Sequence, residues 1–322
     1  MPNLLSIQML VKNDASTIEQ TLESVSPLCK KGANLFVGDL GCTDDTIRIC
    51  RGYNAQIIGV SLNDDMSQAR NFLMTRADSK WNFLIHPYEM IIQGLECLES
   101  AILQPPAAYA ANIFQGDVLS SEIRLWHKNM NLRFKKPVFE TLPGDGQPSG
   151  IYLSANPSAS DLKMDLTKKW LEKSPLTLEP VYYMACVHLS NKNWDAFLNY
   201  AKTYLHQEKS SSMSAIMTNY YCSMVQCYIK KNYQEATRFL IPCLAVRPAM
   251  AEFWCLLGDI YYADNQNQKA KCFYENASIL GTRRLKNDGW PMEISKYKTY
   301  PEKMIEACDK MQELLKTYHA KK

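Results

Sequence analysis

Asp39 is the residue whose type and position suggest chemistry most directly. It ends an apolar segment that starts at residue 35, and a tight turn into a helix is expected to follow it. A carboxylate at the end of a buried strand can accept the imide hydrogen of uracil, or bond a ribose hydroxyl, without a metal ion. An alternative, compatible with the first, is that Thr43 caps the helix and that Asp44 and Asp45 complement its dipole.

Arg70 is a second residue whose type and position suggest binding chemistry. It falls in the first turns of a helix predicted after Asp64 and Asp65, where its fork of donors suits the oxygens of a base or a diphosphate. The alternative is structural: Arg70 pairs with Asp65 and only steadies the loop.

Short apolar runs alternate with polar, helix-like stretches in the first half, which is the pattern of βαβ units around a mostly parallel sheet. The helix at residues 16–25 is predicted to open with a capping box formed by Ser16 and Glu19. Candidate residues follow the predicted strands, where open α/β sheets bind ligands. The strands are expected at residues 4–11, 35–39, 56–60 and 81–85, and further helices at residues 43–51 and 67–76.

After about residue 155 long amphipathic helical stretches replace the strands, and the Pro/Gly/Ser-rich residues 142–161 are predicted to be a linker. The pattern Trp254-x2-Leu257-Gly258-x2-Tyr261, followed by Ala270, Tyr274 and Ala277, resembles a tetratricopeptide repeat. Two fainter copies precede it. Three repeats and a terminal helix at residues 301–318 would form a short solenoid; an unrelated helical bundle is the alternative.

The composition excludes several classes of function. With 36 basic and 33 acidic residues the net charge is only +3, so generic nucleic-acid binding is not expected. No stretch approaches the ~18 apolar residues of a membrane span, and the first residues lack the features of a signal peptide, so we expect a cytoplasmic protein. The 11 cysteines never form a C-x-x-C pair, which favours reduced thiols.

Four segments, taken in order, resemble the amino-terminal half of a family 2 glycosyltransferase with the GT-A fold. They are LLSIQMLVKND (residues 4–14), LFVGDLGCTDDT (35–46), DDMSQARN (64–71) and WNFLIHPYE (81–89). With the repeats, the resemblance covers nearly the whole chain. It implies an α/β, Rossmann-like GT-A domain at residues 1–155 and an all-α tetratricopeptide-like domain at residues 156–322.

The resemblance also implies a set of residues that bind the nucleotide sugar. These are Val11, Lys12, Asn13, Asp14, Asp39, Asp44, Asp65 and Arg70. Lys12 could face a phosphate, although a lysine at the end of a strand is usually just solvated.

The chain departs from the family where a metal would bind. Two aspartates that hold Mg²⁺ or Mn²⁺ in the family are replaced by His86 and Tyr88, and only Glu89 matches. A metal held by His86 and Glu89 is one expectation, and imidazole suits Mn²⁺ or Zn²⁺ better than Mg²⁺. The alternative expectation is that no metal binds, and that Arg70, Lys12 or helix amino termini stabilise the leaving group.

A later stretch, residues 123–142, resembles the segment of the family that ends in His-Glu, but here the pair reads Phe139-Glu140. Glu140 is the candidate general base for an acceptor hydroxyl; a plain surface glutamate is the alternative.

Two functions compete on this basis. The first is an inverting glycosyltransferase that uses a UDP- or GDP-sugar, with the repeats presenting a protein, peptide or glycan acceptor, or a second copy of the chain in a homodimer. The second is a catalytically degenerate transferase that acts as an assembly scaffold through its repeats.

Overall fold

The computed structural model describes residues 4–156, 161–208, 211–284 and 288–320. The chain divides into two compact units, Met1–Ser174 and Pro175–Lys322. Each unit is built around apolar clusters of its own. No helix in the described part of the chain is long and apolar enough to span a membrane.

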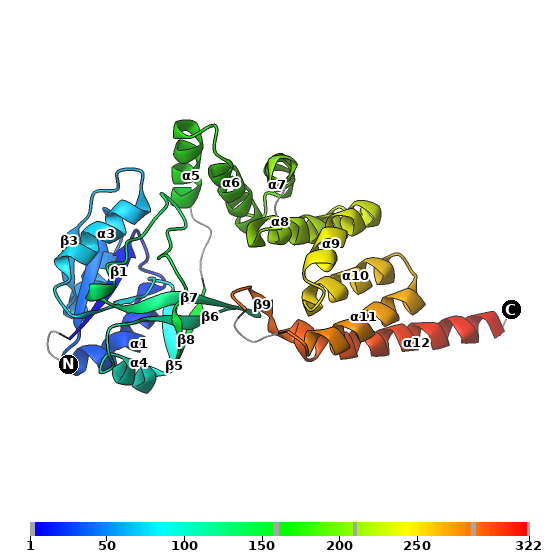
Figure 1. Cartoon of the computed structure of the whole chain (residues 1–322), viewed down its shortest axis with the longest axis horizontal. Coiled ribbons are helices and arrows are strands. Elements are labelled where there is room, and N and C mark those ends of the chain that lie inside the picture. Colours follow the sequence, from blue (N-terminus) through cyan, green and yellow to red (C-terminus); the bar gives the residue numbers. More distant parts are fainter. Residues whose placement is uncertain (1–3, 157–160, 209–210, 285–287, 321–322) are drawn as a thin grey trace. The chain divides into compact units, whose positions relative to one another are not determined.

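The first unit is a mixed sheet covered by helices (Figure 1). Its strands run in the order β3-β2-β1-β4-β7-β6-β8-β5, and the first four are mutually parallel. The elements are β1 (Leu5–Val11), α1 (Ile18–Lys30), β2 (Asn34–Asp39), α2 (Thr46–Gly52), β3 (Gln56–Gly59), α3 (Met66–Arg76), β4 (Trp81–Leu84), β5 (Glu89–Gln93), α4 (Leu95–Ala101), β6 (Ala108–Gln115), β7 (Val118–His127), η1 (Lys128–Met130), β8 (Gln147–Ala155) and α5 (Asp161–Lys173).

Alternation along β1 explains how the sheet carries helices on both faces. All seven of its residues are buried. Ile7 and Met9 join the cluster that contains Leu22 of α1, whereas Leu10 joins the cluster that contains Leu73 of α3. Because successive side chains of a strand point to opposite faces, a nearly continuous apolar run is what a strand covered on both sides requires.

The carboxyl ends of the parallel strands meet at one edge of the sheet. Val11 at the end of β1 is in register with Asp39 at the end of β2, and Asp39 is in register with Gly59 of β3. The segments that follow these strands are therefore neighbours in space, although they are far apart in the sequence.

Two predicted helix starts are wrong. Helix α1 begins at Ile18, and the carbonyl oxygen of Asp14 accepts the backbone N–H groups of Thr17 and Ile18, so no Ser16–Glu19 capping box forms. Helix α2 begins at Thr46 instead of residue 43, because the chain first turns around the Asp39 carboxylate.

The predicted linker is mostly ordered structure. Strand β8 occupies residues 147–155, and residues 157–160 lie outside the described part. Helix α5, which the sequence assigned to the second domain, belongs to the first compact unit. Lys169 and Lys173 of this helix pair with the two carboxylate oxygens of Asp64, at 2.7 and 3.1 Å.

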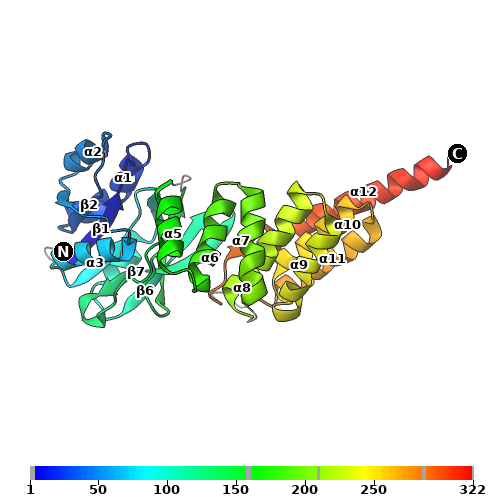
Figure 2. The ribbon, with the colours of Figure 1, turned by 90° about the horizontal axis from the view of Figure 1, so that it is seen from above.

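The second unit contains consecutive helix pairs, α6/α7, α8/α9 and α10/α11 (Figure 2). The turn that joins the two helices of each pair holds a residue in the left-handed region. These residues are Lys192, Lys231 and Asn265, with φ of 57°, 54° and 59°. The elements are α6 (Leu178–Ser190), α7 (Trp194–Gln207), α8 (Met213–Met224), the π-helical turn η2 (Val225–Ile229), α9 (Tyr233–Val246), α10 (Ala251–Ala263), α11 (Asn267–Gly281), β9 (Met292–Glu293), η3 (Ile294–Tyr297) and α12 (Tyr300–Ala320).

Gly258 marks the close contact in the third pair. A Cβ at this position would lie 2.5 Å from the ring of Tyr274, whose hydroxyl donates to Asp259 at 2.7 Å. The same carboxylate oxygen accepts from Tyr300 of α12 at 2.7 Å. The glycine thus lets α11 approach α10 closely enough for these bonds to form.

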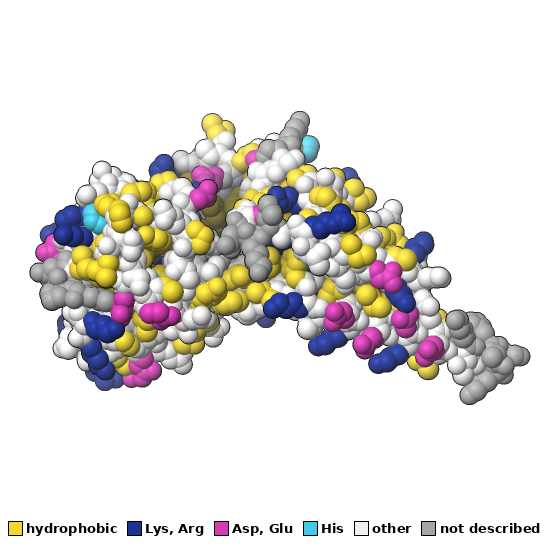
Figure 3. All heavy atoms as spheres, turned by 60° about the horizontal axis from the view of Figure 1, so that its bottom comes forward, with side chains coloured by type: hydrophobic (Ala, Val, Ile, Leu, Met, Phe, Trp, Pro, Cys, Tyr) yellow, Lys and Arg dark blue, Asp and Glu magenta, His cyan; other side chains and the backbone are white. Residues whose placement is uncertain are grey.

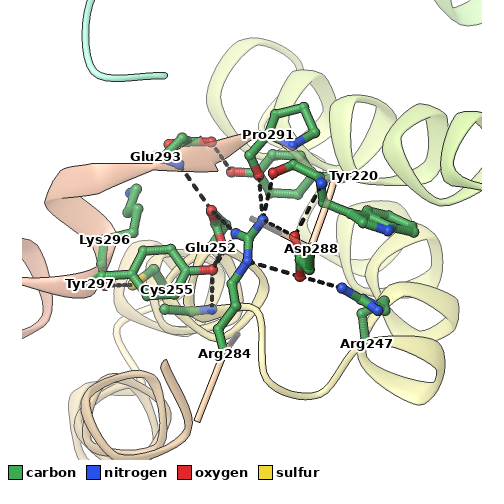
Figure 4. A network of polar contacts seen from close by, with 12 residues as sticks. Tyr220, Arg247, Glu252, Cys255, Arg284, Asp288, Pro291, Glu293, Lys296 and Tyr297 are labelled. Atoms are coloured by element: carbon green, nitrogen blue, oxygen red, sulfur yellow. Dashed lines mark hydrogen bonds and ion pairs between the residues drawn. The ribbon is translucent and has the colours of Figure 1, made fainter. Parts of the chain in front are cut away.

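A buried network around Arg284 ties the segment after α11 to α10 (Figure 4). The guanidinium donates to Asp288 Oδ1 at 3.0 Å, to Glu252 Oε1 at 3.2 Å and to the hydroxyl of Tyr297 at 2.7 Å. It also donates to the carbonyl oxygen of Trp290 at 2.7 Å. Each buried charge has a partner, as burial of ionised groups requires.

Candidate functional site

The Asp39 carboxylate lies at the end of β2 and holds the turn that follows. Its Oδ1 accepts the backbone N–H groups of Gly41, at 2.9 Å, and Cys42, at 2.7 Å. Burial raises the pKa of the Cys42 thiol to about 11, and a hydrogen bond to Asp39 adds to the shift, so the thiol stays a neutral donor. Because both backbone bonds end on Oδ1, Oδ2 is left for this thiol or for a ligand.

Lys12 is directed at the Asp39 turn. Its ammonium donates to the carbonyl oxygens of Leu40, at 3.1 Å, and Gly41, at 2.6 Å. The carbonyl oxygen of Val11 accepts from the Leu40 N–H at 3.1 Å. In this arrangement the lysine charge stabilises the turn, and it would have to leave these carbonyl groups to meet a phosphate.

The loops after β1 and β2 are interlocked by further hydrogen bonds. Asn13 Oδ1 accepts from the Thr43 N–H at 2.8 Å, and the Asp14 N–H donates to Thr46 Oγ1 at 2.8 Å. Asp44 Oδ1 accepts from both the N–H and the hydroxyl of Thr46, at 3.0 and 2.6 Å. Burial raises the pKa of Asp14. Burial also tends to raise the pKa of Asp44, but the hydrogen bonds from Thr46 outweigh it, so the pKa of Asp44 is lowered. The start of α2 is satisfied by Asp44, so the predicted Thr43 cap is wrong.

Asp65 is the N-cap of α3. Its Oδ1 accepts from the Gln68 N–H at 3.1 Å and from the Ser67 hydroxyl at 2.7 Å. The alternative in which Arg70 pairs with Asp65 is wrong, because the guanidinium of Arg70 is engaged elsewhere.

Arg70 joins a buried cluster built from three segments. Its Nε donates to Glu140 Oε1 at 2.6 Å, and its Nη2 lies 3.0 Å from His86 Nδ1. The side chains of Arg70 and Glu140 are only 4% and 9% exposed. Burial, and then the charges of Arg70, Arg124 and Lys163, hold the pKa of His86 well below 6.5. His86 is therefore a neutral imidazole that accepts a hydrogen bond from Arg70.

His86 and Glu89 do not offer a metal site in this arrangement. Glu89 Oε1 accepts from Arg124 at 2.8 Å, and Oε2 accepts from the His86 backbone N–H at 2.9 Å. The His86 ring stacks on the Tyr88 ring, with centroids 5.2 Å apart. No group of three His, Cys, Asp or Glu side chains in the described segments is placed to hold a metal ion. The carboxylate is already used and two guanidinium groups lie beside it, so the donor set does not fit Mn²⁺ or Mg²⁺.

Sequence reasoning missed two cations of this cluster. Arg124 of β7 is 4% exposed, and its Nε is buried without a hydrogen-bond partner among the described residues. Lys163 of α5 lies over the rings of Tyr88, at 5.9 Å, and Phe139, at 5.3 Å. A lone arginine within an apolar strand was a readable signal for Arg124. No signal in the sequence pointed to Lys163, because its helix was assigned to the other domain.

The helical unit has a pocket of about 500 Å³. It is lined by α9 and the turn before it, including Lys231 and Gln234, and by the end of α10 and the turn after it, including Ile260 and Asp264. On the face shown in Figure 3, Lys and Arg side chains are interspersed with Asp and Glu.

No protein-family model and no curated protein matches this chain. Among solved structures, the chain is similar to MamA 41-end from Desulfovibrio magneticus RS-1 (21% identity over 48% of this chain and 84% of that chain, TM-score 0.35). It is also similar to the Sgt2 TPR domain from Aspergillus fumigatus (11%, 44% and 82%, TM-score 0.34). A third is glucosyl-3-phosphoglycerate synthase from Mycobacterium tuberculosis, in complex with Mn²⁺, UDP and glucosyl-3-phosphoglycerate (20%, 35% and 44%, TM-score 0.30). These similarities are too slight to define a shared fold or function.

Proposed function

We propose that the first unit binds a nucleotide sugar, a UDP- or GDP-sugar, and transfers the sugar to a protein, peptide or glycan acceptor. The observation that carries the proposal is the position of Asp39, Arg70 and Glu140. Asp39 lies at the carboxyl edge of the parallel strands. Arg70, on the helix that follows β3, contacts His86, which follows the parallel strand β4, and pairs with Glu140. This edge is where open α/β sheets bind nucleotides. The sequence resemblance to GT-A glycosyltransferases favours the same donor class.

In the proposed reaction an acceptor hydroxyl attacks the anomeric carbon, and the bond from that carbon to the diphosphate oxygen breaks. Glu140 takes the hydroxyl proton, and the nucleoside diphosphate leaves with the bonding electrons. Attack opposite the leaving group inverts the anomeric centre. Arg70 bonds Oε1 of Glu140, so Oε2 is the oxygen that would take the proton.

Calorimetric titration with a panel of UDP- and GDP-sugars tests the proposal. We expect at least one to bind, and Asp39→Ala to weaken it by about tenfold or more, since a hydrogen bond to a charged group contributes about 1.5–3 kcal/mol. Asp45→Ala is the matched control, because Asp45 lies in the same loop but is exposed and pairs with Arg48. Equal affinities in both variants, or no binding by the wild type, would refute it.

A second candidate function, an interaction scaffold that uses the helical unit, is favoured by one observation. The cations Arg70 and Arg124 are already neutralised by Glu140 and Glu89, so the cluster is satisfied without a ligand. This alternative would be established if the wild type binds none of the sugar nucleotides but binds a peptide, and if the Lys231→Ala variant loses that peptide binding.

A further inference from the structure

Residues 288–297 contact both α8 and α10, the first helices of two consecutive helix pairs (Figure 4). The Glu293 N–H donates to Glu252 Oε1 of α10 at 2.9 Å. The Glu293 carboxylate accepts from the hydroxyl of Tyr220 on α8 at 2.5 Å. One short segment of the chain thus bridges two helix pairs.

Two buried charged side chains hold the backbone of this segment. Arg284, which follows α11, donates from Nη2 to the carbonyl oxygens of Trp290 and Pro291, at 2.7 and 3.1 Å. Glu252 accepts the backbone N–H of Glu293. Main-chain hydrogen bonds of this kind supply affinity when a protein surface binds an extended peptide. The surface therefore binds groups that any peptide backbone presents.

Two side chains of the segment add specificity. The Trp290 ring packs against the apolar cluster that contains residues of α8, α9 and α10, and the guanidinium of Arg247 lies over this ring at 4.8 Å. The carboxylate that Tyr220 contacts, that of Glu293, follows three residues later. Tryptophan is among the residues that contribute most to binding at protein interfaces. An aromatic residue followed at the third position by an acidic one is therefore the pattern that this surface recognises.

Burial distinguishes the segment from the helices that it covers. Tyr220 and Glu252 are each only 2% exposed, whereas each of residues 288–297 is half-buried or exposed. A segment of the hydrophobic core would itself be buried. Residues that cover buried groups but stay half-exposed themselves lie on the surface of the helical unit, as a bound peptide would.

We propose that residues 288–297 are an internal ligand, which closes a peptide-binding site on α8 and α10. The site opens to a partner of matching chemistry. This partner is an extended segment of another protein, in which an aromatic residue is followed three positions later by Asp or Glu. It competes with residues 288–297 for the same donors and acceptors. The inference concerns the helical unit alone and does not depend on nucleotide binding by the first unit.

Fluorescence anisotropy of a labelled synthetic peptide with the sequence of residues 288–298, titrated with the whole chain, tests the inference. A double variant of the chain, Trp290→Ala with Glu293→Ala, keeps the surface but weakens the internal ligand. We expect it to bind the peptide about 10- to 100-fold more tightly than the wild type, in which the tethered segment competes at high effective concentration. Lys298→Ala, at an exposed position just after the segment, should bind as weakly as the wild type.

Substitutions in the peptide and in the surface test the recognition pattern. A peptide that carries Trp290→Ala should bind the double variant about tenfold or more weakly. Adding Tyr220→Phe to the double variant should weaken the unmodified peptide about 3- to 10-fold and should not affect a peptide with Glu293→Ala. Equal affinity for all three peptides would contradict the proposed pattern.

Hydrogen exchange of the wild type gives a test that holds even if the double variant does not fold. Backbone amides within residues 290–297 should exchange at least tenfold faster than those in the middle of α10, because the segment opens without unfolding of the helices. Exchange at the same rate as α10 would make the segment a fixed part of the fold and overturn the inference. A folded double variant that binds no peptide would do the same. Wild-type dimers that the double variant cannot form would assign the surface to a second copy and overturn the foreign partner.

Discussion

The ion pair between Arg70 and Glu140 is the residue-level contact with the largest consequence for the first unit. It joins α3 to the segment before β8, and neither side chain is more than 9% exposed. Removing one partner of a buried pair is costly because the other charge is left without compensation.

We therefore predict that Arg70→Met lowers the free energy of unfolding of the first unit by about 3–5 kcal/mol. Urea denaturation monitored on that unit's transition measures the change. The double variant Arg70→Met with Glu140→Gln carries neither charge and should recover much of the loss. A double variant as unstable as the single one would show that packing, not charge, accounts for the effect.

Gly258 gives a second prediction at this scale. An added methyl group would meet the Tyr274 ring and push it away from Asp259, so Gly258→Ala should destabilise the helical unit by about 1–3 kcal/mol. Thermal denaturation followed by circular dichroism measures it. Gly52→Ala is the control, because a Cβ there meets nothing within 4 Å. Equal shifts in the two variants would contradict the steric explanation.

Single residues also show how far sequence reasoning reaches. The position of Asp39 at a strand end could be predicted, because an apolar run of residues precedes it. Its neighbours could not be assigned partners: Lys12 bonds carbonyl groups, and Arg70 bonds Glu140 instead of Asp65. Such pairings join residues that the chain brings together only on folding, as the 70-residue separation of Arg70 and Glu140 illustrates.

Among the elements, residues 288–297 are held both by charged side chains and by the packing of Trp290 and Tyr297 on apolar clusters. Asp288 accepts from Arg284 and from the Trp290 N–H, and it pairs with Arg247 of the neighbouring turn. Burial opposes the shift, but these donors outweigh it and lower the pKa of Asp288 below 3.8.

This lowered pKa predicts a pH dependence with a definite sign. A carboxyl with a depressed pKa in the folded state stabilises the protein above its unfolded pKa, and this stability is lost as the pH falls through the folded value. Asp288→Asn should thus be less stable than the wild type at pH 7, and the difference should shrink below about pH 4. Arg284, Arg247 and Glu252 face the same network. Urea unfolding at several pH values tests this; a constant difference would contradict it.

Strong periodicity made the element types predictable, whereas element ends depended on tertiary bonds. The predicted strand at residues 4–11 matches β1 closely, because its apolar run is covered on both faces. The start of α2 was missed by three residues, since the Asp39 and Asp44 carboxylates hold the preceding turn. The strand β8 was read as a linker, because its proline and its glycine resemble a loop.

For the whole molecule, the division after Ser174 attaches α5 to the unit that carries the candidate site. We predict that a fragment of residues 1–174 unfolds at a higher temperature than a fragment of residues 1–156. The longer fragment keeps the pairs of Lys169 and Lys173 with Asp64. Differential scanning calorimetry of both fragments measures the difference. Equal midpoints would mean that α5 adds nothing to the first unit.

The donor set around His86 and Glu89 does not fit a divalent metal ion, so we expect the first unit to bind a nucleoside diphosphate without one. Diffraction from crystals of the whole chain soaked with UDP or GDP and Mn²⁺, collected at the manganese absorption edge, tests it most directly. We expect density for the base against Asp39 and no anomalous peak between the phosphates and Glu89. A manganese peak at that position, or no nucleotide density at the carboxyl edge of the parallel strands, would contradict it.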